Sequence, residues 1–168
     1  MDLSNVFILR DLINFGGGQI KGRKKMHKIV YIIQQLANPF QPPYEFRWNY
    51  YGVYSEDLAG ELSIGEFFGI LRETPIMEYG YRTYAIEVAD ETNPSVIAGD
   101  ERLKRLVAYL NSKEPRLLEV LSSIMFFENE GLKGEAINEK LYAYKGHLAE
   151  FFDEAYRVYQ ELKSMLTQ

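Results

Sequence analysis

The spacing of apolar residues along this chain changes from helical to strand-like and back to helical, which limits the folds that it can adopt. In the first part, helical spacing predicts a short amphipathic helix over residues 4–15, ended by the glycines at 16–18. A second helix is predicted over about 22–37, with a single buried stripe that contains Met26, Ile29, Val30, Ile33 and Ala37. Prolines exclude a helix in segment 38–43, so we expect a connector there.

The middle of the chain carries strand signals on both sides of a helix. Aromatic residues alternate with polar ones over residues 44–51 and predict one half-buried strand. Ser55 is a good N-cap, and the S-x-x-E pattern of Ser63 and Glu66 predicts that the following helix divides into two, about 55–62 and 64–71. Two β-rich runs, 76–79 and 81–88, predict a hairpin around Gly80.

Helical spacing returns after residue 100. It predicts helices around 103–110, from Pro115 to a glycine stop at 131, around 137–144, and over 148–166. The whole pattern predicts a mainly α (α+β) protein: a winged-helix-like N-terminal lobe over 1–90 with the small hairpin as its wing, then a C-terminal four-helix lobe over 100–168. Residues 89–99 are the expected boundary, and one continuous domain is the alternative.

The residue types available exclude several kinds of catalytic centre and nominate none, and a pair of carboxylates for acid/base chemistry stays open. The chain has no cysteine, so it cannot form a disulfide framework, a thiolate zinc site or a cysteine nucleophile. His27 and His147, its two histidines, lie outside any metal-ligand spacing. Glycines near residue 20 approach the spacing of a phosphate-binding loop, but Arg23 and Lys24 stand where that loop needs lysine and Ser/Thr. We therefore expect a protein that is not an enzyme and holds no cofactor and no metal.

The sequence also predicts where the protein resides. Nowhere do eighteen apolar residues follow one another, so no membrane-spanning helix is expected. The first residues lack a cationic start and a small-residue cleavage site, so no signal peptide is expected. Together with the absence of cysteine, these features favour the cytoplasm.

Charge is unevenly distributed along the chain. Residues 1–43 hold six Lys/Arg and two Asp/Glu, whereas residues 44–95 hold three and ten. Most of the N-terminal positive charge lies in a basic block at a predicted helix start: Lys21, Arg23, Lys24, Lys25 and Lys28. Cations at a helix N-terminus are mildly unfavourable, so an anionic neighbour is expected. That neighbour is a nucleic-acid phosphate, an acidic protein surface or the chain's own acidic middle; plain solvation of the block is the remaining alternative.

The segment after the basic block has the opposite character. Between Ser55 and Gly69 there are four carboxylates and no Lys or Arg, so this helix should repel DNA. The aromatic cluster before it forms core, a base-stacking platform or a protein interface, in which Tyr and Trp are enriched. We predict a protein-binding surface that contains Trp48, Tyr51, Tyr54, Glu56, Asp57 and Glu61.

Several segments resemble a known family. GRKKMHKIVYIIQ, NYYGVYSEDLAGEL and GILRE resemble the YwgA-like proteins, which are distantly similar to the Panacea or SocA-like antitoxin domain; a weaker likeness extends to LLEVLSSIMFFENEG and the final helix. The resemblance implies no catalytic residues and implies action by protein contact, as in adaptors that neutralise a toxin or deliver it to a protease. The recurrent positions match Lys25, Lys28, Tyr31, Tyr51, Gly52, Tyr54 and Ser55.

Together these features predict a non-catalytic regulatory or adaptor protein that binds another protein or a second copy of itself. The alternative is a transcriptional regulator that binds DNA through the basic helix start at 21–28. An enzyme of unknown reaction is the third and weakest hypothesis.

Overall fold

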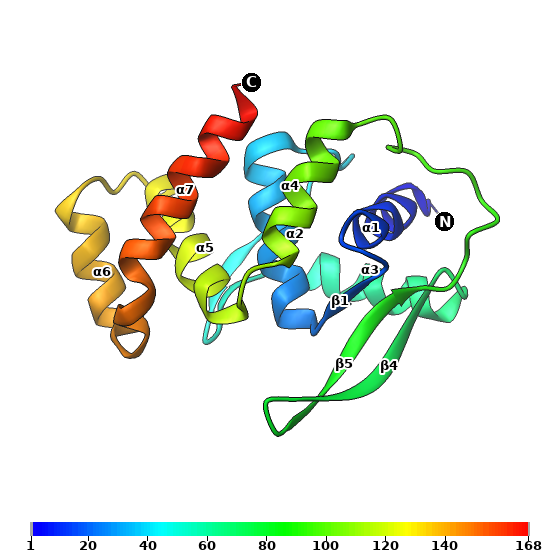
Figure 1. Ribbon diagram of the computed structural model, residues 1–168, viewed down its shortest axis with the longest axis horizontal. Coiled ribbons are helices and arrows are strands. Elements are labelled where there is room, and N and C mark those ends of the chain that lie inside the picture. The colour runs from blue at the N-terminus through cyan, green and yellow to red at the C-terminus, as the bar shows by residue number, and fades with distance from the viewer. Residues whose placement is uncertain (1, 168) are drawn as a thin grey trace.

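A computed structural model describes residues 2–167 (Figure 1). Helices make up 58% of the chain and strands 15%, which confirms the predicted mixed and mainly helical class. The predicted helices near the N-terminus are confirmed as α1 (Ser4–Phe15) and α2 (Arg23–Ala37). A three-residue strand between them, β1 (Gln19–Lys21), was not predicted.

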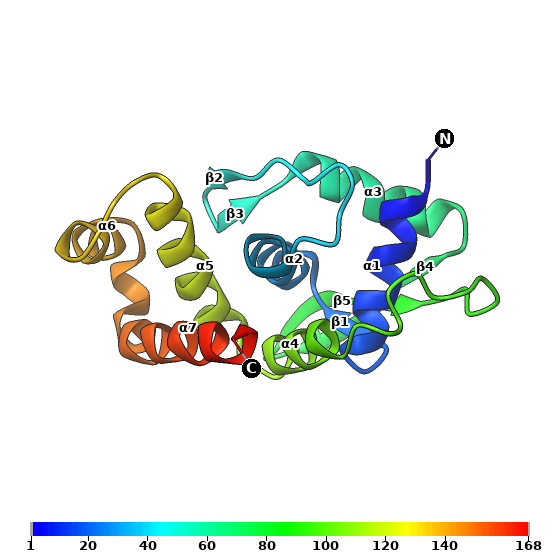
Figure 2. The same cartoon turned by 90° about the horizontal axis from the view of Figure 1, so that it is seen from above.

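Helix α2 lies at the centre of the molecule, with α1, α3, α4 and α5 around it (Figure 2). The predicted apolar stripe is buried at Met26, Ile29, Val30 and Ile33, but the buried surface of this helix is wider. It also includes His27, Lys28, Tyr31 and Ile32. The extra buried face is covered by α5 and by the strand β3, which come from distant parts of the chain. Three polar or charged groups are thus enclosed by packing that no local pattern indicates.

The predicted strand over 44–51 is a tight hairpin. Strand β2 (Arg47–Asn49) turns at Tyr50 and pairs with β3 (Gly52–Tyr54), so that Trp48 lies opposite Val53. Gly52 has a φ of 100°, which L-residues rarely adopt. A Cβ there would also lie 3.7 Å from Glu119 Cγ, so the hairpin packs closely on α5.

Helix α3 (Glu56–Phe67) is continuous, so the predicted division into two helices is wrong. Ser55 caps it as predicted, and its hydroxyl accepts a hydrogen bond from the Leu58 amide. Ser63 does not cap a second helix, because it lies within α3 and its hydroxyl accepts a hydrogen bond from Arg23 Nη2 at 3.2 Å. A tertiary contact has replaced the local capping box.

The predicted second hairpin is confirmed as β4 (Leu71–Glu78) and β5 (Tyr81–Val88), joined by a two-residue turn at Tyr79 and Gly80. Its first strand begins at Leu71 and not at residue 76, so the predicted helical end at 71 is wrong. Both turn residues have positive φ, as a type I′ turn requires. The sheet order is β1-β5-β4, with Ile20 opposite Ile86. In Figure 1 this hairpin projects away from the helices.

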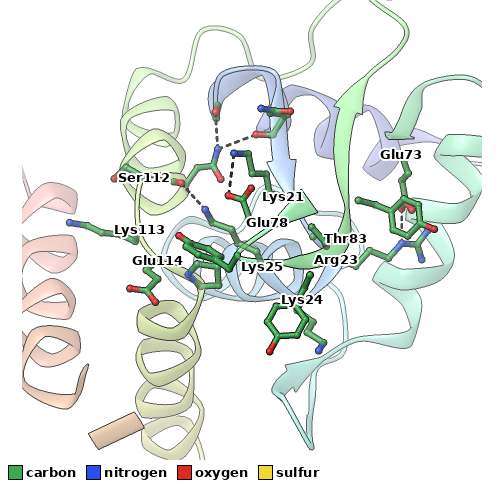
Figure 3. A pocket seen from close by; sticks show the side chains of 18 of the residues that line it. Lys21, Arg23, Lys24, Lys25, Glu73, Glu78, Thr83, Ser112, Lys113 and Glu114 are labelled. Atoms are coloured by element: carbon green, nitrogen blue, oxygen red, sulfur yellow. Dashed lines mark hydrogen bonds and ion pairs between the residues drawn. The ribbon is translucent and has the colours of Figure 1, made fainter. Parts of the chain in front are cut away.

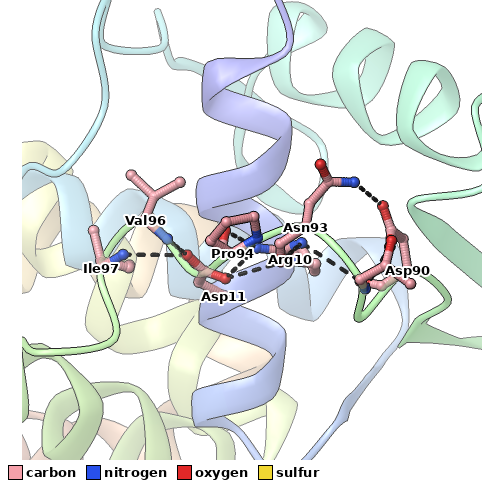
Figure 4. Close-up of polar contacts among 8 residues, drawn as sticks. Arg10, Asp11, Asp90, Asn93, Pro94, Val96 and Ile97 are labelled. Atoms are coloured by element: carbon pink, nitrogen blue, oxygen red, sulfur yellow. Dashed lines mark hydrogen bonds and ion pairs between the residues drawn. The ribbon is translucent and has the colours of Figure 1, made fainter.

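The segment between β5 and α4, residues 89–100, contains no helix or strand and runs around the outside of α1 (Figure 1). We call it the linker; it includes residues 89–99, whose role as a boundary between lobes stays a prediction. Two adjacent buried residues of α1 hold it, as Figure 4 shows. Arg10 Nη2 donates to Pro94 O at 2.9 Å and to Asp11 Oδ1 at 3.0 Å. Asp11 Oδ2 accepts from Val96 N at 2.7 Å and from Ile97 N. The linker is therefore fixed to the first helix by hydrogen bonds to its backbone.

The C-terminal part consists of α4 (Glu101–Asn111), α5 (Pro115–Asn129), α6 (Glu135–Lys145), a 3-10 segment η1 (Gly146–Phe151) and α7 (Phe152–Leu166). The predicted start of the last helix at 148 is wrong, because Leu148 has non-helical backbone angles and α7 begins at Phe152. The other predicted helices are confirmed. Among residues 2–167, none of the helices combines the length and the apolar character needed to cross a bilayer.

One buried apolar cluster includes residues from both sides of the linker, from Val6 in α1 to Leu162 in α7. The division into lobes at 1–90 and 100–168 stays a prediction. The contacts of α2 with α4 and α5 place the two parts side by side (Figure 2).

Candidate functional site

Four members of the basic block line one open groove of about 1120 Å³, which we call the basic groove (Figure 3). It is bounded by the glycine run, the tip of the β4–β5 hairpin and the junction of α4 with α5. Arg82 and Lys113 add positive charge to it, but three carboxylates line it too: Glu73, Glu78 and Glu114. The groove is therefore mixed in charge.

Much of the basic block is paired within the chain. Arg23 Nε lies 2.6 Å from Glu73 Oε1, and Lys21 Nζ lies 3.4 Å from Glu78 Oε1. Both carboxylates belong to the acidic middle, which was one of the predicted neighbours. Lys25 Nζ donates to Asn111 O at 2.8 Å. The largely exposed Lys21–Glu78 pair contributes about 0–1 kcal/mol, and the Arg23–Glu73 pair is partly buried; both pairs lower the local charge of the groove.

Lys24 and Lys28, one helical turn apart in α2, have different environments. Lys24 is exposed, and its ammonium lies 3.3 Å from the centre of the Tyr51 ring, a cation–π contact. Lys28 is 3% exposed and points into the interior. Its burial removes it from any surface that could meet nucleic acid.

Lys28 belongs to a buried cluster with Glu119 and Lys145, here called the lysine–glutamate cluster. Lys28 Nζ lies 3.4 Å from Glu119 Oε1, and Lys145 Nζ lies 2.9 Å from Glu119 Oε2. Lys145 is 2% exposed and also donates to Tyr50 O at 3.2 Å. Burial lowers the pKa of Lys28, and the charge of Glu119 opposes that shift. Two ammonium groups thus share one carboxylate inside the protein.

His27 is also buried, beside this cluster in sequence. Its Nδ1 accepts a hydrogen bond from the Ser55 amide at 3.2 Å, and its ring stacks on Tyr54 with centres 4.6 Å apart. Burial, followed by the charges of Arg23 and Lys28, lowers the pKa of His27 to about 4. The imidazole is therefore neutral at pH 7, with its hydrogen on Nε2.

The predicted protein-binding residues divide into two groups. Tyr51, Glu56 and Asp57 are exposed. The other three are partly buried and make internal contacts: Trp48 packs on Phe127, Tyr54 on His27, and Glu61 accepts a hydrogen bond from the Tyr44 hydroxyl. Burial raises the pKa of Glu61 and raises that of Tyr44. Only the exposed group is free to contact a partner directly.

The chain is 31% identical over 154 residues to uncharacterised protein YwgA of Bacillus subtilis (strain 168), an alignment that covers 88% of this chain and 90% of that protein. The chain belongs to the YwgA family. No protein-family profile matches the chain, and no solved structure does. Membership of the YwgA family confirms the nearer of the two predicted resemblances, and the likeness to the antitoxin domain stays a prediction.

Some features of this YwgA family protein were missed by sequence reasoning. Phe67 and Phe68, at the end of α3, are 83% and 51% exposed and contact each other edge to face. A double phenylalanine before Gly69 was the available signal for this pair. Lys145 gave no signal, since it is an ordinary polar position at the end of a predicted helix, whereas Glu119 stands alone in the apolar run LLEVL, which was the available signal for its burial. Within residues 2–167 no group of His, Asp and Glu could hold a metal ion.

Proposed function

We propose that this YwgA family protein is a non-catalytic adaptor or regulatory module that binds another protein through α3. The observation that carries the proposal is the composition of one exposed face, here called the α3 face: Glu56, Asp57, Phe67 and Phe68. Glu56 and Phe67 are eleven positions apart, so they lie on one side of the helix. Transferring a phenylalanine from water to a partner contributes about 1.5–3 kcal/mol.

The chemistry of the α3 face defines its partner. Acidic residues at one end and exposed rings at the other fit a protein surface that offers Lys or Arg beside an apolar recess. Within the described residues, Arg47 forms an ion pair with Glu56, and Asp57 is the acidic residue at the start of α3 that has no such partner. The order of α1, α2, α3 and the β4–β5 hairpin supports a winged-helix-like arrangement, in which α3 would hold the place of a recognition helix. An antitoxin-like role is the narrower form of this proposal.

The proposal is tested by placing a photo-crosslinking amino acid at Phe67 in the native cell. We expect one protein to be captured reproducibly from position 67 and not from Glu139, an exposed control position on α6. With that protein purified, Asp57→Lys together with Phe67→Ser should weaken binding at least about tenfold, whereas Glu139→Lys should not change it. Equal binding by both variants would contradict the proposal.

A second candidate, DNA binding, is favoured by one observation. Lys24, Lys25 and Arg82 line the basic groove together with two exposed tyrosines of the hairpin tip, Tyr79 and Tyr81. Phosphate contacts by these cations would make binding steeply salt-dependent. A gel-shift series with random-sequence duplex at 50 and 200 mM salt tests it, with Lys24→Glu and Lys25→Glu as variants. No shift at 50 mM salt excludes this candidate.

A further inference from the structure

A second, smaller cavity lies between α2 and the β2–β3 hairpin. Its volume is about 180 Å³, and its lining includes Arg23, Lys24, His27, Lys28, Asn49 and Tyr51. In contrast to the basic groove, no Asp or Glu among the described residues lines it. A cavity with three cationic side chains and no carboxylate is electrostatically suited to an anion.

The donors of this cavity are incompletely used. Lys28 has three N–H groups, and among residues 2–167 only Glu119 accepts from them, at 3.4 Å. The His27 ring is 3% exposed; its Nδ1 is occupied by the Ser55 amide, and its Nε2–H has no acceptor within the same residues. The guanidinium of Arg23 forms an ion pair with Glu73, so Arg23 contributes positive electrostatic potential to the cavity but no free hydrogen-bond donor. Among residues 2–167 no side-chain nitrogen is both buried and without a partner, so these donors are available to a ligand but do not require one.

The charged groups around the cavity indicate what kind of anion would bind there. Glu119 balances one of the two ammonium groups in the lysine–glutamate cluster, which leaves one positive charge, and Lys24 on the Tyr51 ring supplies a second. Two positive charges match a phosphate, which carries about −1.5 to −2 at pH 7.

The size of the cavity limits the ligand further. Drug-sized ligands need pockets of about 300–1,000 Å³, so 180 Å³ accommodates a single small group. We propose that the cavity between α2 and the β2–β3 hairpin binds a phosphate group, held by Lys24, His27 and Lys28 beside Tyr51. The phosphate is either the free ion or the terminal group of a small phosphorylated molecule. The residues of this site lie outside the α3 face, so the phosphate proposal does not depend on the proposed protein partner.

Isothermal titration of the full chain with orthophosphate, glycerol 3-phosphate and acetate, at constant ionic strength set with NaCl, tests the proposal. We expect saturable one-to-one binding of orthophosphate, with acetate at least tenfold weaker. Tighter binding of glycerol 3-phosphate than of orthophosphate would assign the site to a phosphorylated molecule, and weaker binding would assign it to the free ion. Absence of saturable phosphate binding, or acetate binding of equal strength, overturns it.

Two variants and a control locate the binding. Lys28→Met leaves Lys145 and Glu119 as a one-to-one pair, and Lys24→Met changes an exposed residue, so both variants should fold, as circular dichroism can check. Each should weaken phosphate binding at least tenfold. Lys104→Met, which removes an exposed lysine from α4, should leave binding unchanged. Equal affinities of Lys24→Met, Lys28→Met and Lys104→Met would place any bound phosphate elsewhere and would refute the proposal.

Discussion

The charged residues of this protein differ from one another mainly in whether they are exposed or buried. Lys21 and Lys28 belong to the same short basic block, yet Lys21 is exposed on β1 and Lys28 is enclosed next to Glu119. Isolated charges are costly inside a protein, so each buried one depends on its partner far more than an exposed one does. Predictions about single residues therefore centre on Glu119 and His27.

Glu119→Gln should strongly destabilise the fold, because it leaves two buried ammonium groups without a carboxylate. Loss of one partner of a buried ion pair typically costs about 3–5 kcal/mol in the free energy of unfolding. Urea denaturation followed by circular dichroism measures the change. Glu150→Gln, at an exposed position in η1, should change stability by less than about 0.5 kcal/mol. Similar values for the two variants would show that the cluster contributes little.

His27 should make stability depend on pH. Its pKa is about 4 in the folded protein and 6.5 for the ordinary side chain, so between these values the unfolded chain binds a proton that the folded chain does not. The contribution of His27 to the free energy of unfolding is fully present above pH 6.5 and decreases by about 3 kcal/mol as the pH drops to 4. In urea unfolding at pH 4.5 and 7, His27→Gln should show a smaller difference than the parent. His147→Gln, at an exposed position, should show the parent's difference.

At the scale of elements, the period of apolar residues predicted most helices and the β4–β5 hairpin, because those elements bury one face against a single core. The apolar period failed to predict the local structure where contacts with a distant element determine it. Strand β1 is only three residues long, and it forms because Ile20 pairs with Ile86. Helix α3 is continuous, and the hydroxyl of Ser63 accepts a hydrogen bond from Arg23 instead of capping a second helix.

The candidate site was predicted less completely for the same reason. The basic block was visible as a run of charges, and the acidic start of α3 was visible as a capped helix. Glu119 and Lys145 are 91 and 117 positions from Lys28, and nothing in the sequence around either residue points to Lys28. Only the packing of α5 and α6 near α2 brings the three together, and no local pattern records that packing.

The β2–β3 hairpin depends on Gly52. Gly52→Ala should lower the free energy of unfolding by about 1–3 kcal/mol, because its φ of 100° is strained for alanine. Gly60→Ala is the matched control: Gly60 lies within α3 with no atom near an added Cβ, so alanine should stabilise the fold by about 0.5–1 kcal/mol. Thermal unfolding of both variants checks the opposite signs. Equal shifts in the same direction would contradict the assigned strain.

At the scale of the whole molecule, the two sides of the linker share one buried cluster, and the linker itself is fastened to α1 (Figure 4). In a helix or strand, backbone N–H and C=O groups pair with one another. In the linker, Arg10 instead donates to the Pro94 carbonyl and Asp11 accepts from the Val96 amide. A segment without helix or strand is thereby kept in one position.

Asp11→Ala should release the linker. It removes the acceptor of the Val96 and Ile97 amides and the partner of buried Arg10. Limited digestion with proteinase K, followed by mass spectrometry, should show faster cleavage within residues 89–99 than in the parent. Asp153→Ala, at an exposed position at the start of α7, should be cleaved at the parent's rate. Unchanged cleavage in Asp11→Ala would mean that the apolar core alone orders the linker.

The sheet order β1-β5-β4 also determines when the fold can be completed on the ribosome. Ile20 and Ile86 are 66 positions apart. At ~5–20 residues per second, β1 leaves the exit tunnel roughly 3–13 s before its partner strand leaves it. During that interval the nascent chain presents α1 and α2 with much of their apolar surface uncovered, and it is then that a cellular chaperone would have most to bind.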